Sequence, residues 1–285
     1  MKIAVLSGKG GTGKTLVSVN LSTVAKESIY IDCDVEEPNG HLYFKPKNIQ
    51  KEDVTVKIPK VDNEKCNGCR KCVEFCKFNA LAYIKNKLFI FDEICHSCGG
   101  CMLVCPEDAL FETEKVIGKV EKGYYNNISI YTGILNIGEA SGIPIVKKLI
   151  DENKNKDKLT IIDCPPGSAC IVMETIRDVD YCILVAEPTI FGVHNLNMVY
   201  ELVRLFNKPF GVIINKYLEE ENPVKKFCVK NNIKIIEKIP FDTELGKINS
   251  NGEIAVEKSG KYNQLFSNLL DKVIKEAGNE TTVNP

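Results

Sequence analysis

Continuous apolar runs alternate with longer stretches of helical periodicity along most of the chain. The apolar runs, each followed by a loop, are KIAVLS, SIYIDCD, LTIIDCP, YCILVAE, FGVIINK and IKIIEKIP. Runs without polar–apolar alternation are typical of strands in a parallel sheet that is covered on both faces. Helical patterns such as KTLVSVNLSTVAKE and VHNLNMVYELVRLFN lie between several of them. The pattern predicts a doubly wound α/β fold with a mostly parallel sheet, which binds ligands at the carboxyl ends of its strands.

Residues 61–112 interrupt this rhythm and contain an internal repeat. The segment CNGCRKCVEFCKFNAL, at 66–81, aligns with CHSCGGCMLVCPEDAL, at 95–110, as far as the closing Ala-Leu. A repeat of so short a unit marks a small self-contained domain, and the α/β pattern resumes after it. We therefore expect an inserted domain at 61–112 within a discontinuous α/β domain formed by 1–60 and 113–285.

Composition narrows the classes of protein that remain. The formal net charge of the 285 residues is −1, whereas a broad nucleic-acid surface needs a clear basic excess. No apolar run approaches the roughly 20 residues that span a bilayer, and KIAVL leads into a glycine-rich loop without the parts of an export signal. We expect a cytoplasmic protein with no membrane span and no nucleic-acid partner. In that compartment the 13 cysteines favour metal ligation over disulfides.

The glycine-rich loop SGKGGTGKT, at 7–15, directly follows the first apolar run. Gly8, Gly13, Lys14 and Thr15 fit the pattern G-x-x-x-x-G-K-[ST] between a predicted strand and a predicted helix. In this pattern, backbone N–H groups and the positive end of the helix dipole hold phosphates. We expect the Lys14 ammonium to reach the β- and γ-phosphates and the Thr15 hydroxyl to bind Mg²⁺.

The loop also carries a second lysine, Lys9, which phosphate binding alone does not require. The segment KGGTGKT, at 9–15, resembles the K-G-G-x-G-K-[ST] signature of the deviant P-loop ATPases of the MinD, ParA, Mrp and nitrogenase iron protein group. In that family the first lysine reaches across a homodimer to the phosphates bound by the partner subunit. The resemblance implies an ATP-dependent homodimer in which Lys14 holds the chain's own nucleotide. Lys9 would then supply a cation in trans, as an arginine finger does.

Two acidic segments extend the resemblance. IDCDVEEPNG follows the second predicted strand, where the family places its first switch, and IIDCPPG ends another strand, where the second switch begins. The resemblance implies that Asp32 lies near the Mg²⁺ waters, that Asp34 orients the attacking water and that Asp163 is the Walker B carboxylate. An aspartate at one strand end is often only a turn former, but here two strands beside the glycine loop end this way.

The family resemblance also assigns residues to the nucleotide. Those around the phosphates are Gly8, Lys9, Gly10, Gly11, Thr12, Gly13, Lys14, Thr15 and Leu16. Those at the adenine pocket are Asn215, Pro240 and Asp242, which follow two late strands. Catalysis would rest on Lys9, Lys14 and Asp34, and Mg²⁺ would be held by Thr15, Asp32 and Asp163.

The cysteine block has the spacing of an iron–sulfur protein. Each half of the repeat reads C-x₂-C-x₂-C-x₃-C, the pattern of two-cluster bacterial ferredoxins, in which the fourth cysteine of one run ligates the cluster of the other. The expected ligands of one [4Fe–4S] cluster are Cys66, Cys69, Cys72 and Cys105, and those of the second are Cys76, Cys95, Cys98 and Cys101. A zinc site is the alternative interpretation of paired C-x₂-C motifs, which the repetition of the full set disfavours.

Together these features resemble the MinD-superfamily ATPases that contain a ferredoxin domain: a P-loop NTPase fold with an inserted α+β, bacterial-ferredoxin-like domain. The principal hypothesis is an ATP-gated homodimer with Mg²⁺ and two [4Fe–4S] clusters that passes electrons to an unidentified redox or metallocluster protein. One alternative is an Mrp-like ATPase that assembles or carries clusters, which predicts exposed cysteines beyond the eight. A MinD-like positioning ATPase would need a basic amphipathic terminus.

Cys170 is a further candidate thiol. It lies in DCPPGSAC, seven residues after Asp163. In the nitrogenase iron protein a cysteine at this offset from the corresponding aspartate ligates a cluster that the two subunits share. The simpler interpretation is a small buried residue at the start of the next helix.

Overall fold

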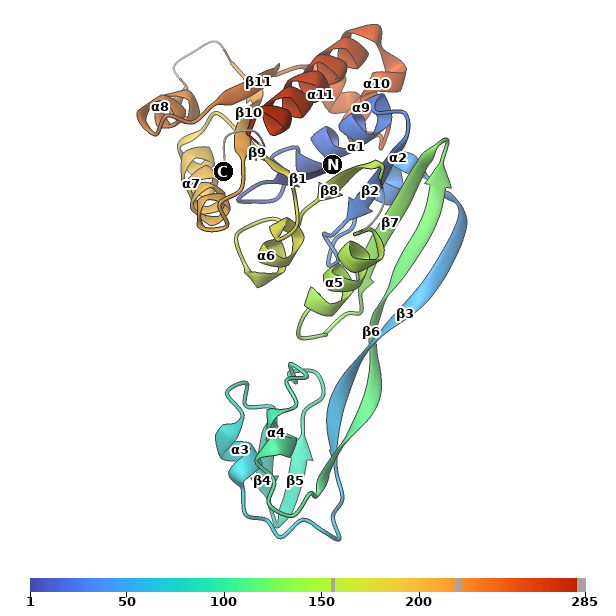
Figure 1. Cartoon of the computed structure of the whole chain (residues 1–285), viewed down its shortest axis with the longest axis vertical. Coiled ribbons are helices and arrows are strands. Elements are labelled where there is room, and N and C mark those ends of the chain that lie inside the picture. The colour runs from blue at the N-terminus through green and yellow to red at the C-terminus, as the bar shows by residue number, and fades with distance from the viewer. Residues whose placement is uncertain (155–156, 219–221, 281–285) are drawn as a thin grey trace.

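The computed structural model describes residues 1–154, 157–218 and 222–280, and it has an α/β body with a small unit on a long ribbon (Figure 1). The body contains a nine-stranded sheet of order β11-β10-β9-β1-β8-β2-β7-β6-β3. Its parallel strands are β1 (Lys2–Leu6), β2 (Ser28–Asp32), β7 (Ile128–Leu135), β8 (Leu159–Asp163), β9 (Tyr181–Ala186), β10 (Phe210–Tyr217) and β11 (Ile235–Pro240). All six strands expected from apolar runs are present, so the prediction of a mostly parallel sheet is confirmed.

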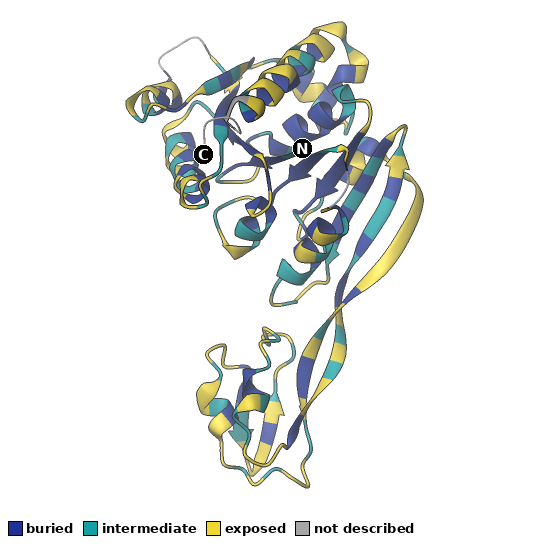
Figure 2. Cartoon of the chain, in the orientation of Figure 1, coloured by how far each residue is buried: buried dark blue, intermediate teal, exposed yellow. Residues whose placement is uncertain are grey.

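Helices cover both faces of this sheet, and its central strands are buried apart from the first residues of β1 and β8 (Figure 2). Successive side chains of a strand point to opposite faces, so Ala4 and Leu6 lie in one core while Ile3 and Val5 lie in the other. The helices of the first core are α5 (Ile143–Glu152), α6 (Cys170–Ile176), α7 (Ile190–Leu205) and α8 (Pro223–Lys230). Those of the second are α1 (Lys14–Val24), α2 (Gly40–Phe44), α9 (Thr243–Ser250), α10 (Ala255–Lys258) and α11 (Gly260–Glu280). Within the described residues, no helix has both the length and the apolar character needed to cross a bilayer.

One edge of the sheet is antiparallel and leaves the body as a two-stranded ribbon (Figure 1). β3 (Lys47–Val61) pairs with β6 (Leu110–Tyr125), which pairs in turn with β7. Only the part of β6 from Gly118 onward is paired with β7. The rest of the ribbon therefore extends beyond the body, with Val61 opposite Leu110 at its far end. The apolar pattern of the sequence did not indicate these three strands.

The ribbon ends in a small unit that contains both halves of the cysteine repeat. Its elements are α3 (Lys71–Phe75), β4 (Leu81–Ile84), β5 (Lys87–Ile90) and α4 (Gly100–Leu103). The unit has a hydrophobic core of its own, formed by Cys72, Ala80, Leu81, Leu88, Cys101 and Leu110. The expected insert boundaries, 61 and 112, fall at the distal end of the ribbon.

Candidate functional site

The glycine-rich loop joins β1 to α1 at the carboxyl edge of the parallel strands. Gly13 has a φ of 96°, in the left-handed region, and an added Cβ there would lie 2.1 Å from Asn215 Nδ2. The Asn215 amide donates a hydrogen bond to the Thr12 carbonyl oxygen at 2.8 Å. Lys216 Nζ donates to the Gly11 carbonyl oxygen at 3.3 Å. The end of β10 therefore braces the loop, and only glycine at position 13 permits both its φ and this close approach.

Lys14 opens α1 with its ammonium buried among carboxylates. Its Nζ lies 2.9 Å from Asp163 Oδ1 and 3.6 Å from Asp34 Oδ2. Burial lowers the pKa of Lys14, but attraction to Asp163 and Asp34 outweighs burial and raises it above its ordinary value. The residue is a permanent cation at the first turn of a helix, where anions bind.

Asp32 is fully buried and organises the segment that follows β2. Its carboxylate accepts hydrogen bonds from the backbone N–H groups of Asp34, Asn39 and Gly40, at 3.2, 3.1 and 2.8 Å. Burial and the neighbouring charge of Asp163 raise the pKa of Asp32. These bonds wrap the segment 34–40 around the carboxylate and bring Asp34 beside Lys14.

Asp163 lies next to Asp32, its partner in the register of β2 and β8. Its Oδ2 accepts a hydrogen bond from the Tyr30 hydroxyl at 3.0 Å. Burial and the charge of Asp163 raise the pKa of Tyr30 well above its ordinary value, so this hydroxyl stays a donor. Burial also raises the pKa of Asp34 to about 6, although Lys14 opposes the shift. The site thus joins one lysine to the carboxylates of Asp32, Asp34 and Asp163.

An open cavity of about 640 Å³ lies over these groups, a volume typical of small-molecule sites. Residues of the glycine loop, of the segment 34–37 and of the segment 165–171 line it. Its other wall comes from α2, α9 and the residues after α9, where the Tyr43 hydroxyl donates to Asn249 Oδ1 at 2.9 Å. The lining residues of this wall are Asn39, Leu42, Tyr43, Asn249, Ser250 and Gly252. Sequence reasoning missed this wall because no short motif marks residues that only packing brings together.

The three positions expected at the adenine pocket do not line this cavity. Asn215 is buried beneath the glycine loop, as described above, and Pro240 is exposed at the end of β11. Asp242 caps α9, accepting from the backbone N–H groups of Glu244 and Leu245. A hydrogen bond from Lys261 lowers the pKa of Asp242 to about 2. Asp242 therefore serves as the N-cap of α9. Its assignment to the adenine pocket stays a prediction.

Lys9 is directed to a different set of partners from Lys14. Its Nζ lies 3.0 Å from Glu187 Oε2, with the Lys9 side chain 43% exposed and that of Glu187 13% exposed. Lys216 binds the other carboxylate oxygen of Glu187. Burial raises the pKa of Glu187, but hydrogen bonds from Lys216 and Lys9 outweigh burial and lower it. The carboxylate of Glu187 thus ties the start of the glycine loop to the end of β10.

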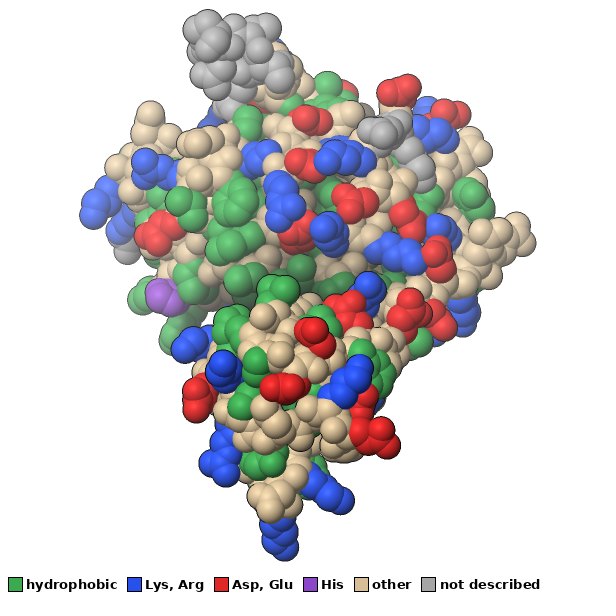
Figure 3. Space-filling model, turned by 60° about the horizontal axis from the view of Figure 1, so that its bottom comes forward, with side chains coloured by type: hydrophobic (Ala, Val, Ile, Leu, Met, Phe, Trp, Pro, Cys, Tyr) green, Lys and Arg blue, Asp and Glu red, His purple; other side chains and the backbone are tan. Residues whose placement is uncertain are grey.

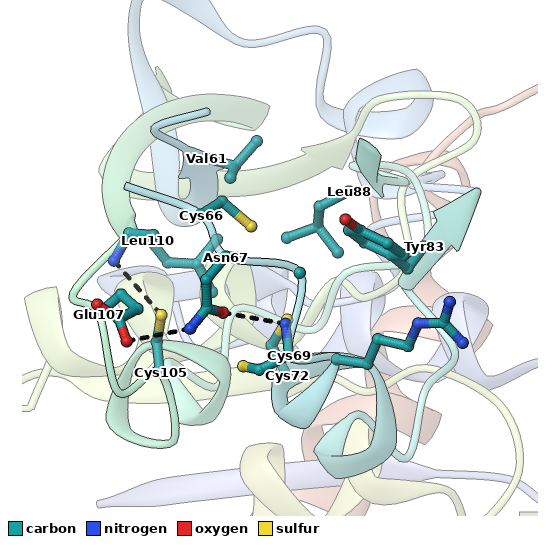
Figure 4. Close-up of a pocket in the computed structure, with 13 residues that line it drawn as sticks. Val61, Cys66, Asn67, Cys69, Cys72, Tyr83, Leu88, Cys105, Glu107 and Leu110 are labelled. Carbon is teal, nitrogen blue, oxygen red and sulfur yellow. Dashed lines mark hydrogen bonds between the residues drawn. The ribbon is translucent and has the colours of Figure 1, made fainter. Parts of the chain in front are cut away.

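The eight clustered cysteines form two sets of four. A narrow cavity in the small unit is lined by Cys66, Cys69, Cys72 and Cys105 (Figure 4). A second cavity, of about 280 Å³, is lined by Cys76, Cys95, Cys98 and Cys101. Each set combines three cysteines of one run with the fourth cysteine of the other. These are the two sets that the ferredoxin spacing predicts.

The sequence repeat is also a repeat of local geometry. Ala80 N–H lies 3.4 Å from Cys76 Sγ, and Ala109 N–H lies 3.4 Å from Cys105 Sγ. Left-handed backbone recurs at matching positions, which are Gly68 and Ser97, Arg70 and Gly99, and Asn79 and Asp108.

Within the described chain, no group of three or more His, Cys, Asp or Glu side chains is gathered closely enough to hold a single metal ion.

The five scattered cysteines differ in exposure. Cys33, Cys164, Cys182 and Cys228 are buried, and burial raises the pKa of Cys164 to about 12. Cys170 is exposed at the first residue of α6, between two residues that line the large cavity. The interpretation of Cys170 as a buried packing residue is therefore wrong.

Known proteins resemble the chain in both of its parts. Residues 3–256 match the family described as the CobQ/CobB/MinD/ParA nucleotide binding domain. Uncharacterized protein MJ0578 of Methanocaldococcus jannaschii is 31% identical over 281 residues, which cover 96% of each chain. Uncharacterized ferredoxin MJ0722 of the same organism is 39% identical over 54 residues, which cover 18% of this chain and 70% of the ferredoxin. The structure of MinD from Pyrococcus horikoshii with Mg-ADP gives a TM-score of 0.62 at 20% identity and covers 97% of each chain.

Proposed function

Because this chain belongs to the CobQ/CobB/MinD/ParA nucleotide binding domain family, we propose that it binds and hydrolyses ATP as a homodimeric switch. Its ferredoxin-like segment carries two [4Fe–4S] clusters, and the nucleotide state controls electron transfer to an unidentified redox or metallocluster protein. The observation that carries the proposal is the arrangement of the clustered cysteines as two sets of four, in a unit that a ribbon joins to a nucleotide site.

Each polar group of the nucleotide site has a role in this proposal. Lys14 binds the β- and γ-phosphates, and the neighbouring carboxylates of Asp163 and Asp34 support this role because they keep the ammonium charged and in place. Thr15, Asp32 and Asp163 would hold Mg²⁺, which prefers oxygen ligands of this kind. Asp34 lines the cavity beside Lys14 and orients the attacking water.

Lys9 acts on the nucleotide of the partner subunit. Its half-exposed ammonium is bound to Glu187, and Lys9 is absent from the residues that line the cavity of its own chain. A surface lysine beside the loop can reach a second copy placed against this edge of the sheet. There it adds a positive charge where phosphoryl transfer develops negative charge, which makes hydrolysis depend on the dimer.

The chemistry of the two cysteine sets fits [4Fe–4S] clusters. Thiolates are the ligands of such clusters, and N–H groups directed at ligand sulfurs, as at Cys76 and Cys105, stabilise the reduced state. A cluster bound by four cysteines supplies one-electron transfer. Loss of a cluster to a client would require these ligands to be exchanged, which favours electron transfer over cluster delivery from the small unit.

Cluster assembly is a second candidate function, and one observation favours it. Cys170 is exposed beside the nucleotide cavity, so two such thiols, one from each subunit, would be available in a dimer. In Cys170→Ser, unchanged iron content and partner reduction would exclude this function for the thiol. Loss of partner activity with both ferredoxin-type clusters intact would make Cys170 part of the mechanism.

The experiment that tests the proposal uses the anaerobically purified full chain. We expect about eight iron and eight sulfide per chain, the content of two cubanes. Lys9→Ala is expected to bind nucleotide almost as the parent does but to lose hydrolysis and ATP-dependent dimerisation in sedimentation velocity. Lys14→Ala, the matched variant, is expected to lose nucleotide binding itself. Stoichiometric zinc in place of iron, or hydrolysis at the parent rate by Lys9→Ala, would contradict the proposal.

A further inference from the structure

Lys115 of β6 connects the small unit to the body away from the ribbon pairing. Its Nζ donates to Glu139 Oε2 at 2.8 Å and to the Asp92 carbonyl oxygen at 3.1 Å. The side chains of Lys115 and Glu139 are 20% and 12% exposed. An ion pair with little exposure and direct hydrogen bonds holds its geometry better than the exposed pairs on most protein surfaces. Lys115 is thus a fixed link between two loops.

One of these loops carries cluster ligands. Asp92 lies three residues before Cys95 in the sequence, and its carboxylate also accepts a hydrogen bond from Lys60 at 3.0 Å. Lys115 and Lys60 therefore anchor the start of the loop 92–98, which supplies Cys95 and Cys98 to the second cysteine set.

The other loop, 136–142, runs from β7 to α5. It contacts two segments that line the nucleotide cavity, 34–37 and 165–171. At its start, Leu135 N–H donates to the Val35 carbonyl oxygen at 2.8 Å. At its end, a Cβ added to Gly142 would lie 2.4 Å from Val35 Cγ2 and 3.1 Å from Ile171 Cδ1. Val35 and Ile171 line the nucleotide cavity. They directly follow Asp34 and Cys170, so both proposed switch segments meet this loop.

A cavity of about 180 Å³ separates the two loops. Residues 95–97 line it on the side of the small unit and residues 139–141 on the side of the body. Figure 3 shows hydrophobic side chains in the hollow where the small unit meets the body. The loops therefore have room to approach or separate without unpacking either core.

We infer that Lys115 is a positioning residue that transmits the state of the nucleotide site to the loop bearing Cys95 and Cys98. This inference rests on the proposed function. Segments that contact a γ-phosphate rearrange when it is lost. Under the proposed function, the segments that contain Val35 and Ile171 are of this kind. Their movement displaces the loop 136–142 at both ends, and the Glu139–Lys115 pair carries the displacement to Asp92. The surroundings of the cluster held by Cys95 and Cys98 change as a result, and these surroundings set its reduction potential.

The test compares Lys115→Met with Lys119→Met in the anaerobic full chain. Lys119 lies on the same strand, but its Nζ binds Glu121 within the ribbon, at 3.0 Å. Two quantities are measured with ADP and with a non-hydrolysable ATP analogue: hydrogen exchange of residues 92–98, and the EPR spectrum of the dithionite-reduced protein. In the parent and in Lys119→Met, we expect the hydrogen exchange and the EPR spectrum to differ between the ADP state and the state with the ATP analogue. In Lys115→Met the difference is expected to disappear, while iron content and nucleotide affinity stay at the parent level.

A second variant, at Glu139, shows whether the loss in Lys115→Met comes from the ion pair or from a local defect at Lys115. Glu139→Gln is expected to lose the same nucleotide response, and the double variant is expected to lose no more than either single one, because both remove one contact. An undiminished response in Lys115→Met overturns this inference alone. A parent that binds nucleotide and iron but shows no response overturns it too. A parent that binds no nucleotide or no iron overturns the proposed function together with it.

Discussion

Asp34 is a residue of the nucleotide site whose negative charge the fold disfavours. Burial raises its pKa to about 6 even though Lys14 is close by. A carboxyl whose pKa rises on folding stabilises the fold fully only below its unfolded pKa of about 4. That contribution is lost as pH increases through about 6. At neutral pH the chain therefore keeps a charged Asp34 at the expense of stability, as functional residues often require.

Replacing Asp34 with asparagine tests this conclusion. We expect Asp34→Asn to have a higher Tm than the parent at pH 8, because the unfavourable charge is gone, and to lose ATP hydrolysis. The gain in Tm is expected to shrink at pH 5, where the parent carboxyl is largely protonated. Differential scanning calorimetry of the parent and of Asp34→Asn at pH 8 and at pH 5 measures the difference in Tm. A parent at least as stable as the variant at pH 8 would contradict the assigned shift.

Asn215 should matter for nucleotide affinity even though it does not line the cavity. In Asn215→Ala the Thr12 carbonyl oxygen loses its donor, and a lost buried hydrogen bond costs about 1–3 kcal/mol. We expect ADP to bind roughly tenfold more weakly, the change that corresponds to about 1.4 kcal/mol, in isothermal titration calorimetry. Asn231→Ala is the control, because its amide donates to the Phe227 carbonyl oxygen at 2.9 Å in α8. Equal affinities in all three proteins would refute the bracing role.

The residues of the glycine loop and the clustered cysteines could be predicted because their chemistry depends on spacing along the chain. The contact between Asn215 and Thr12 could not, since it joins residues 203 positions apart. The same holds for Glu187, which no motif connects to Lys9. Family resemblance assigned Asn215 to adenine, whereas the described structure places its amide against the loop.

Among the elements, the ribbon strands differ physically from the strands that the sequence revealed. Most of β3 is exposed, and charged pairs such as Lys51–Glu121 and Lys57–Glu112 cross to β6. A strand with solvent on both faces has no apolar run, and only Val54, Val56 and Ile58 show alternation. Hydrophobic periodicity reports burial, so strands that leave the core give little signal. The central strands, buried on both faces, gave a strong one.

The junction of the ribbon with the sheet depends on Gly118. A Cβ at this position would lie 2.2 Å from the Ile134 carbonyl oxygen of β7, so Gly118→Ala must separate two paired strands. We expect the free energy of unfolding to fall by about 1–3 kcal/mol, as for other overpacked sites, in urea titration. Gly246→Ala in α9 has open space around it and should be neutral or stabilising, because alanine favours helix. Equal effects of the two substitutions would contradict the packing at β7.

The repeat in the small unit predicts that each fourth cysteine serves the set of the other run. Cys105→Ala should lower iron from about eight to about four per chain. Cys66→Ala/Cys105→Ala should lose no more, because both residues line one cavity. Cys95→Ala/Cys105→Ala should lose nearly all iron, because Cys95 belongs to the other set. The reverse order of the two double variants would show that each run binds its cluster alone.

At the scale of the whole molecule, the ribbon determines where the small unit lies relative to the nucleotide site. The sequence predicted two units, but their relative placement depends on the course of β3 and β6, which no local pattern specifies. In the structure the loop 92–98 lies near the start of α5, and α5 packs beside α6 of the nucleotide site. This placement supports the proposal that the nucleotide site and the clusters influence each other within one chain.

Such coupling is reciprocal for binding free energies, so the ratio of the affinities for a non-hydrolysable ATP analogue and for ADP should depend on the redox state of the clusters. The most direct test measures both affinities in one anaerobic preparation, first oxidised and then reduced with dithionite. The cluster-deficient Cys95→Ala/Cys105→Ala variant controls for effects of dithionite itself. We predict that the ratio changes on reduction in the parent and not in the variant. The same ratio in the oxidised and reduced parent, with about eight iron per chain and both nucleotides bound, would contradict the coupling.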